Sequence, residues 1–146
     1  MTRSFAIAII IYSLVATAFH SGLQAQDKGV FDYQQQIDAG KDIKKIVFIA
    51  DAGTHGPRGN HEFMAGSILL AKQINSAYPN VHAVVHSTNN WPKNLTHADA
   101  VIVSLNHGQR AATDGEIAQA VRRGAGFMAV HFGVEVNKGE AGDNYL

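Results

Sequence analysis

Histidine side chains follow three of the four hydrophobic runs in this sequence, at the point where each run ends. They are His55 and His61 after the first run, His107 after the third, and His131 at the end of the fourth. A neutral imidazole ring binds metal ions and exchanges a proton near pH 7. The positions of these four histidines therefore indicate acid–base or metal chemistry.

Side chains that could bind a ligand lie near these histidines in the sequence. Arginine and amide groups donate hydrogen bonds to hydroxyl groups and to developing oxyanions, and a positioned histidine serves as a general acid or base. We expect the catalytic residues to be His131, His107 and His55. We expect the substrate-binding residues to be Arg58, Asn106, Glu135 and His61, with Arg110 nearby.

A metal ion is a second chemical possibility for the same residues. Neutral imidazoles together with a carboxylate such as Asp51 or Glu135 suit zinc. The candidate ligands are His55, His107 and His131. The sequence leaves open whether a zinc-like divalent metal is bound, and it names no other cofactor.

Each histidine also has a structural interpretation. His107 precedes Gly108 and could be a turn residue, while His61 could belong to the first turn of a helix. His131 stands at the exit of a hydrophobic run, where a core residue is poorly placed, so a functional role is favoured there. The other histidines of the mature chain are expected to be structural (His82 and His86) or solvated (His97).

The hydrophobic runs predict the elements that would hold these side chains. Strands are expected at 46–50, 81–86, 99–105 and 126–132, since continuous β-branched runs are typical of strands buried on both faces. Helices are expected at 62–78, with Asn60 as N-cap, and at 113–123, opened by a Thr113–Glu116 capping box. This order predicts an α/β fold with a doubly wound, mainly parallel sheet.

Two parts of the pattern are irregular. The segment between the second and third strands is short for a parallel crossover, which needs about a dozen residues, and we expect an irregular turn there. After Phe132 the polar, Gly-rich sequence predicts no helix to cover the last strand. In open α/β sheets ligands bind at the carboxyl ends of the strands, so the four histidines are expected to lie at one edge.

The first residues have the pattern of a secretory signal peptide. Arg3 precedes an apolar run from Phe5 to Phe19, and small and polar residues follow as far as Ala25. We expect 1–25 to be a cleaved signal and the protein to be exported, either periplasmic or secreted, with no stable membrane insertion after cleavage. An uncleaved membrane anchor is the alternative. Residues 26–44 are expected to be a polar leader with a short helix around 33–39.

Composition excludes several classes of function. The 146 residues fit one domain, and a net charge of zero argues against a broad surface for nucleic acid or anionic lipid. The chain has no cysteine, which excludes disulfides, thiolate catalysis and Cys-type zinc sites. A serine-hydrolase elbow (G-x-S-x-G), a metalloprotease H-E-x-x-H motif and a nucleotide-binding glycine loop are also lacking.

The segments that carry these histidines resemble the ThuA-like (trehalose-utilisation type) family, which has a flavodoxin-like, class I glutamine amidotransferase-like fold. The similar segments are 45–50 with His55-Gly56, the helix start at His61, 98–103, 138–146 and, most specifically, 124–132 (Gly-Ala-Gly-Phe-Met-Ala-Val-His-Phe). The resemblance implies that His131 stands at the elbow where an amidotransferase carries its cysteine. The absence of cysteine agrees with this and excludes a glutaminase.

The resemblance implies a domain at 45–146 that corresponds to the first part of the family domain and is incomplete at its C-terminus. The implied function is carbohydrate utilisation, with a small trehalose-type disaccharide as ligand. His131 would be a general acid, base or ligand, with His55 and His107 as partners, and Arg58 and Asn106 would hold sugar hydroxyls. Two alternatives stay open, namely a non-catalytic sugar-binding or accessory module and a truncated fragment without a function of its own.

Overall fold

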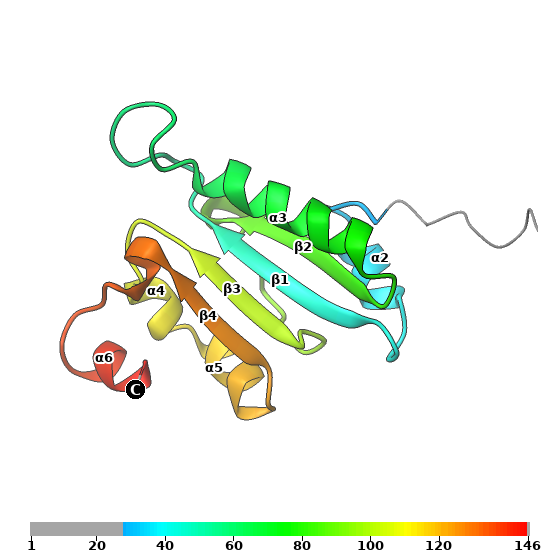
Figure 1. Ribbon diagram of the computed structural model, residues 1–146. Helices are drawn as coiled ribbons and strands as arrows, with labels where there is room; N and C mark the ends of the chain where they lie inside the picture. The colour runs from blue at the N-terminus through cyan, green and yellow to red at the C-terminus, as the bar shows by residue number, and fades with distance from the viewer. Residues whose placement is uncertain (1–27, 146) are drawn as a thin grey trace, which may run out of the picture.

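The computed structural model describes residues 28–145, and within them four parallel strands form one sheet in the order β2-β1-β3-β4 (Figure 1). The elements are α2 (Tyr33–Asp38), β1 (Lys44–Ala50), α3 (Phe63–Ala77), β2 (Val81–Ser87), the 3₁₀ helix η1 (Thr88–Asn90), β3 (Ala100–Ser104), α4 (Gln109–Ala112), α5 (Gly115–Arg122), β4 (Gly126–Val130), the 3₁₀ helix η2 (His131–Val134) and α6 (Glu140–Asn144). The predicted doubly wound α/β fold is confirmed.

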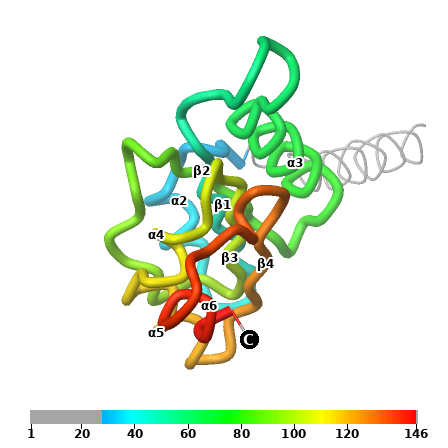
Figure 2. Tube along the Cα trace, turned by 90° about the vertical axis from the view of Figure 1, so that its left-hand side faces the viewer, coloured from blue at the N-terminus to red at the C-terminus, as the bar shows by residue number. Residues whose placement is uncertain are grey.

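Helices cover both faces of the sheet, as the nearly continuous apolar strands require. On one face Phe63 and Ala71 of α3 pack against Phe48 and Val85 of the sheet. On the other face Ile117 of α5 packs against the remaining buried strand residues, with α2 and α4 beside it. Figure 2 shows α3 on one side of the strands and α2 and α4 on the other. Successive side chains of each strand therefore pack into two separate hydrophobic cores, one on each face of the sheet.

The second helix begins differently from the capping box that we expected. Asp114, not Thr113, is the N-cap of α5, and its carboxylate accepts from the Ile117 N–H at 2.9 Å. Thr113 instead closes α4, because its hydroxyl donates to the carbonyl oxygen of Gln109 at 3.0 Å. Glu116 accepts from the backbone N–H of Leu95 instead of reaching back to the cap. The Thr113–Glu116 prediction was wrong because the short helix α4 precedes α5.

The first long helix also begins later than predicted. Glu62 is the N-cap of α3, and its side chain makes no capping hydrogen bond. Its carboxylate instead accepts from the backbone N–H of Gly59 at 2.9 Å. Asn60 therefore does not cap the helix, because the loop before it continues to Glu62.

Part of the expected polar leader belongs to the folded unit. Val30 is buried in the core beside α3, and its carbonyl accepts from the N–H of Val85 in β2. Gln36 of α2 donates through its amide to the carbonyls of Ile46 and His82. The predicted short helix is confirmed as α2. The expected signal peptide, 1–25, lies outside the described residues, and within 28–145 no helix is long and apolar enough to cross a membrane.

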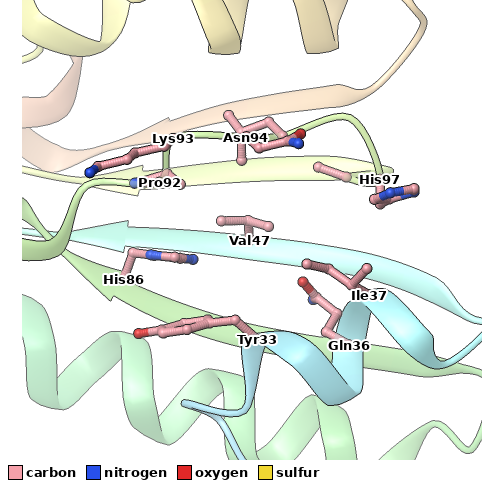
Figure 3. Close-up of a pocket in the computed structure, with 11 residues that line it drawn as sticks. Tyr33, Gln36, Ile37, Val47, His86, Pro92, Lys93, Asn94 and His97 are labelled. Carbon is pink, nitrogen blue, oxygen red and sulfur yellow. The ribbon is translucent and has the colours of Figure 1, made fainter.

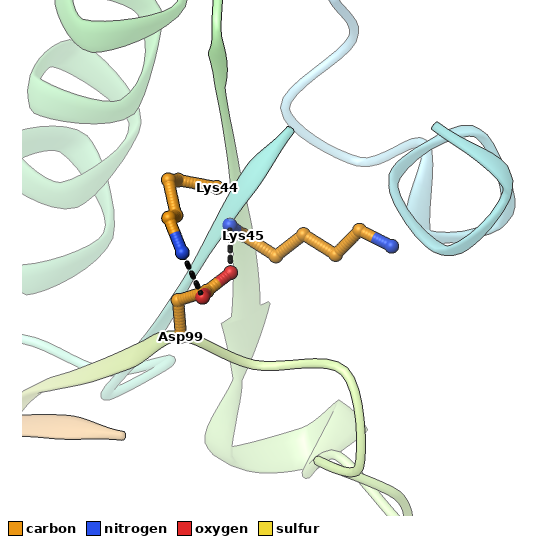
Figure 4. A network of polar contacts seen from close by, with 3 residues as sticks. All are labelled: Lys44, Lys45 and Asp99. Carbon is orange, nitrogen blue, oxygen red and sulfur yellow. Dashed lines mark hydrogen bonds and ion pairs between the residues drawn. The ribbon is translucent and has the colours of Figure 1, made fainter. Parts of the chain in front are cut away.

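Asp99 ties β1 to the start of β3 at the amino end of the sheet (Figure 4). Its carboxylate accepts from the backbone N–H of Lys45 at 2.8 Å and from the Lys44 ammonium at 3.0 Å. Desolvation raises the pKa of Asp99, but the Lys45 hydrogen bond and the Lys44 charge together outweigh it, so the pKa lies below its usual value. Asp99 therefore fixes the register of these two strands.

The segment after β4 contains a helix that the sequence pattern did not predict. α6 is only five residues long and has no apolar periodicity, so the pattern could not reveal it. It lies against α4, where the Asn144 amide donates to the carbonyl of Ala112. On the other side of the sheet α3 does not reach β4, so Met128 is 56% exposed.

Candidate functional site

The four strands point toward one edge of the sheet, where the loops with the candidate side chains emerge (Figure 1). From β1 the chain passes to β2 on one side and then to β3 on the other, so β1 and β3 border the topological switch point. Such a point opens a crevice at the carboxyl ends of the strands. We therefore describe the site from the residues that directly follow β1 and β3.

Asp51 connects the loops at this switch point. Its carboxylate accepts from the Thr88 hydroxyl at 3.1 Å and from the backbone N–H of Asn106 at 3.2 Å. Its own N–H donates to the carbonyl of Ser104 at 2.9 Å. The loops after β1, β2 and β3 are thus held together by one carboxylate, which makes Asp51 a positioning residue.

Three of the four predicted histidines come together around Phe132. The rings of His55 and His61 have centres 5.1 Å apart, and those of His61 and His131 are 4.8 Å apart. The Phe132 ring lies 5.1 Å from His55 and 4.1 Å from His131. The loop after β1 and the turn after β4, 76 residues apart at His55 and His131, are therefore neighbours in space.

One hydrogen bond fixes the tautomer of the central ring. Nδ1 of His61 lies 2.6 Å from the carbonyl oxygen of His55, which can only accept, so Nδ1 carries the proton and donates. In the neutral ring Nε2 then holds the lone pair. His61 thus offers a nitrogen that can accept a proton or bind a cation.

His131 has a backbone conformation that differs from those of its neighbours. Its φ is +55°, and within 28–145 it is the one non-glycine residue with positive φ. The left-handed region costs an L-residue about 1–2 kcal/mol, and residues held there cluster at functional sites. His131 also stands where β4 turns into η2, and its side chain is exposed. The strand-to-helix turn therefore presents this imidazole at the sheet edge.

His107 does not join the three-histidine cluster. Its Nδ1 accepts a hydrogen bond from the backbone N–H of Gln109 at 3.2 Å, which closes the turn before α4. This hydrogen bond agrees with the interpretation of His107 as a turn residue. The next residue, Gly108, is buried, and its N–H donates to the carbonyl of Glu135 at 2.8 Å.

The expected substrate-binding residues occupy different places along the edge. Arg58 is exposed in the same loop as His55. The Glu135 side chain is exposed after η2, whereas its backbone is bound to Gly108. Asn106 lies at the switch point, and its side-chain oxygen is buried with no hydrogen-bond partner among the described residues. The Asn106 side-chain oxygen is therefore, like Nε2 of His61, an acceptor that receives no hydrogen bond from the described residues.

Trp91 and Thr88 border the same edge, although the pattern of residue types had not indicated a role for either of them. The Arg110 guanidinium lies 3.9 Å from the centre of the Trp91 ring and donates to the Thr88 carbonyl at 3.2 Å. Trp91 in turn donates through Nε1 to the Asp114 carboxylate at 2.9 Å. The available signal was the single tryptophan of the chain, placed in the Asn- and Pro-containing loop after the second predicted strand.

A cavity lies on the face of the sheet, away from this edge. It has a volume of about 110 Å³ and separates α2 from the segment after η1 (Figure 3). The Tyr33 and His86 rings stack along one side with centres 4.0 Å apart, and Val47 forms the floor. Burial lowers the pKa of His86, whose Nδ1 donates to the Asn90 carbonyl. These contacts, like the burial of His82, agree with the structural roles predicted for both histidines.

The described residues do not form a ready metal centre. Within 28–145, no three histidine or carboxylate side chains are arranged to hold a metal ion. The expected set of His55, His107 and His131 is divided, because His107 is engaged in the turn before α4. A zinc-like metal thus stays a prediction from sequence.

No family model, curated protein or solved structure matches this chain. The resemblance to the ThuA-like family therefore rests on the segments that carry it, above all 124–132.

Proposed function

We propose that this protein is an exported ThuA-like domain protein that acts on a small carbohydrate at the carboxyl edge of its sheet, with His131 as the acid–base residue. The observation that carries the proposal is the positive φ of His131 at the exit of β4. A strained strand-to-helix turn is how α/β enzymes expose a reactive side chain above the sheet. The resemblance implies this elbow at the same residue.

The geometry supports a simple division of roles. His131 exchanges a proton with a sugar hydroxyl or with a water molecule that attacks the sugar, since imidazole does so near neutral pH. The lone pair on Nε2 of His61 lies in the adjacent ring and accepts a hydrogen bond from the ligand. His55 fixes the orientation of His61 through its carbonyl oxygen. Phe132 forms the apolar wall beside all three rings.

Asn106 and Arg58 complete the proposed binding site. Asn106 at the switch point and Arg58, exposed in the loop of His55, would each hold a sugar hydroxyl, as the resemblance implies. His107 has no part in this version, because its ring closes the turn before α4, and the exposed Glu135 carboxylate is given no role in it. The competing version is a non-catalytic sugar-binding module that uses the same residues.

The two versions are separated by one pair of measurements on the mature protein. A panel of disaccharides is screened by thermal shift, and the stabilising ones are incubated and examined for products. Asparagine tolerates positive φ, so His131→Asn keeps the turn and removes the acid–base group. We expect it to lower turnover by 10²-fold or more, whereas His97→Asn, in an exposed loop, leaves turnover unchanged.

Stabilisation without product would favour the binding module over the enzyme. The proposal as a whole fails if no carbohydrate shifts the melting temperature, or if His131→Asn turns over as fast as the wild type.

A further inference from the structure

An open groove of about 380 Å³ lies between the segment that follows β2 and the start of α4. It is lined by Thr88, Asn89, Asn90, Trp91, Lys93 and Arg110. Two of these side chains are cationic, two are amides, and none is acidic. Such a lining attracts an anion and offers hydrogen-bond donors to its oxygens.

Arg110 is held in place before any ligand arrives. Its guanidinium stacks on the Trp91 ring at 3.9 Å, and one of its N–H groups donates to the Thr88 carbonyl. Trp91 is fixed in turn, because it packs against the core and donates to Asp114. A guanidinium has five N–H donors in a rigid fork, so most of them are not used by these contacts.

Arg110 also lacks a carboxylate partner among the described residues. The one ion pair within 28–145 joins Lys44 and Asp99 at the far end of the sheet. A stacked, tethered and unneutralised guanidinium loses little side-chain entropy when it binds a planar or tetrahedral oxyanion. Lys93 supplies a second positive charge in the same groove.

We propose that this groove binds an oxyanion, a carboxylate or a phosphate, of a small ligand, with Arg110 as the bidentate donor and Lys93 as the second cation. Thr88 connects the groove to the switch point, because its hydroxyl donates to Asp51 while its carbonyl accepts from Arg110. If the proposed function is correct, the ligand is an acidic or phosphorylated sugar; the anion site itself does not depend on that function.

The test is isothermal titration of the purified full-length protein at low ionic strength. The titrants are inorganic phosphate, glucose 6-phosphate, glucuronate and neutral glucose. We expect at least one of the anions to bind and glucose to bind at least tenfold more weakly. The anion that binds best identifies the source of the charge: phosphate alone, a phosphorylated sugar or a sugar acid.

Two variants and two controls assign the binding to the groove. Arg110→Gln and Lys93→Gln are each expected to weaken anion binding, the former by at least tenfold. Arg122→Gln removes an exposed charge from the end of α5 and is expected to have no effect. Inorganic phosphate has no sugar to contact His131, so its binding is expected to be unchanged in His131→Asn, and a failure of the proposed function does not affect this result.

The inference is overturned if no anion binds, if glucose binds as tightly as the best-binding anion, or if both Arg110→Gln and Lys93→Gln bind that anion like the wild type. Circular dichroism melts establish that each variant is folded. Lys93 is exposed, so its variant provides the result even if Arg110→Gln is unstable.

Discussion

At the scale of single residues, the backbone of His131 decides what its side chain can do. An extended residue at this point would continue β4, and its side chain would lie against the sheet. With φ at +55° the chain turns into η2, and the imidazole lies beside His61 and Phe132. The backbone strain is confined to His131, so substitutions at this position measure its contribution to the free energy of unfolding.

We predict that glycine at position 131 gives a more stable protein than alanine. Glycine adopts positive φ without steric cost, whereas alanine retains the penalty of about 1 kcal/mol. At an ordinary exposed position the order is reversed, because glycine loses more backbone entropy. The measurement is urea denaturation of His131→Gly and His131→Ala. A more stable alanine variant would contradict the positive φ.

At the scale of elements, the loops after β3 and β4 are packed together at Gly108. Its N–H donates to the Glu135 carbonyl, and the hydroxyl of Tyr145 donates to the carbonyls of Gly108 and Gly133. A Cβ atom at position 108 would overlap the Gly133 carbonyl oxygen. The absence of a side chain there lets the two loops approach each other.

Gly108→Ala is therefore expected to destabilise the protein by about 2 kcal/mol, since overpacking forces backbone shifts. Gly66→Ala is the matched control. It lies within α3 with open space around its Cβ position, so alanine should stabilise the helix by about 0.5–1 kcal/mol. Both values are read from chemical denaturation curves. Equal stability of Gly108→Ala and the wild type would show that the two loops are not in contact.

At the scale of the whole molecule, two histidines of β2, the buried His82 and the partly buried His86, link folding to pH. Burial is the main cause that lowers the pKa of His82 and of His86. An unfolded histidine takes up its proton near pH 6.5, before the folded one does. The contribution to stability is therefore complete above pH 6.5 and falls as the pH drops below it toward the folded pKa.

We predict that the free energy of unfolding falls between pH 7 and pH 5, and that His82→Asn and His86→Asn each reduce this slope. His97→Asn, in an exposed loop, should retain the wild-type slope. The lowered pKa of Asp99 adds a separate loss only at more acidic pH, as that carboxylate becomes protonated below its usual value of 3.8. A flat profile from pH 7 to pH 5 would contradict the burial of these histidines.

The sequence by itself determined the number, order and approximate limits of the strands and the parallel, doubly wound class. These features follow from local periodicity and from connection lengths, which the chain carries in consecutive residues. Local sequence also placed His131 at a strand exit and His82 inside a strand. It did not reveal α6 or the start of α5 at Asp114, because short helices and competing caps leave little periodic signal.

Only the tertiary structure decided which side chains meet at the sheet edge. His61 and His131 are 70 residues apart in the chain, and their contact depends on the strand order and on the turn at His131. The same folding separates His107 from them and brings Arg110 onto Trp91. Side-chain contacts between loops depend on packing between distant segments, which residue types and spacing along the chain do not encode.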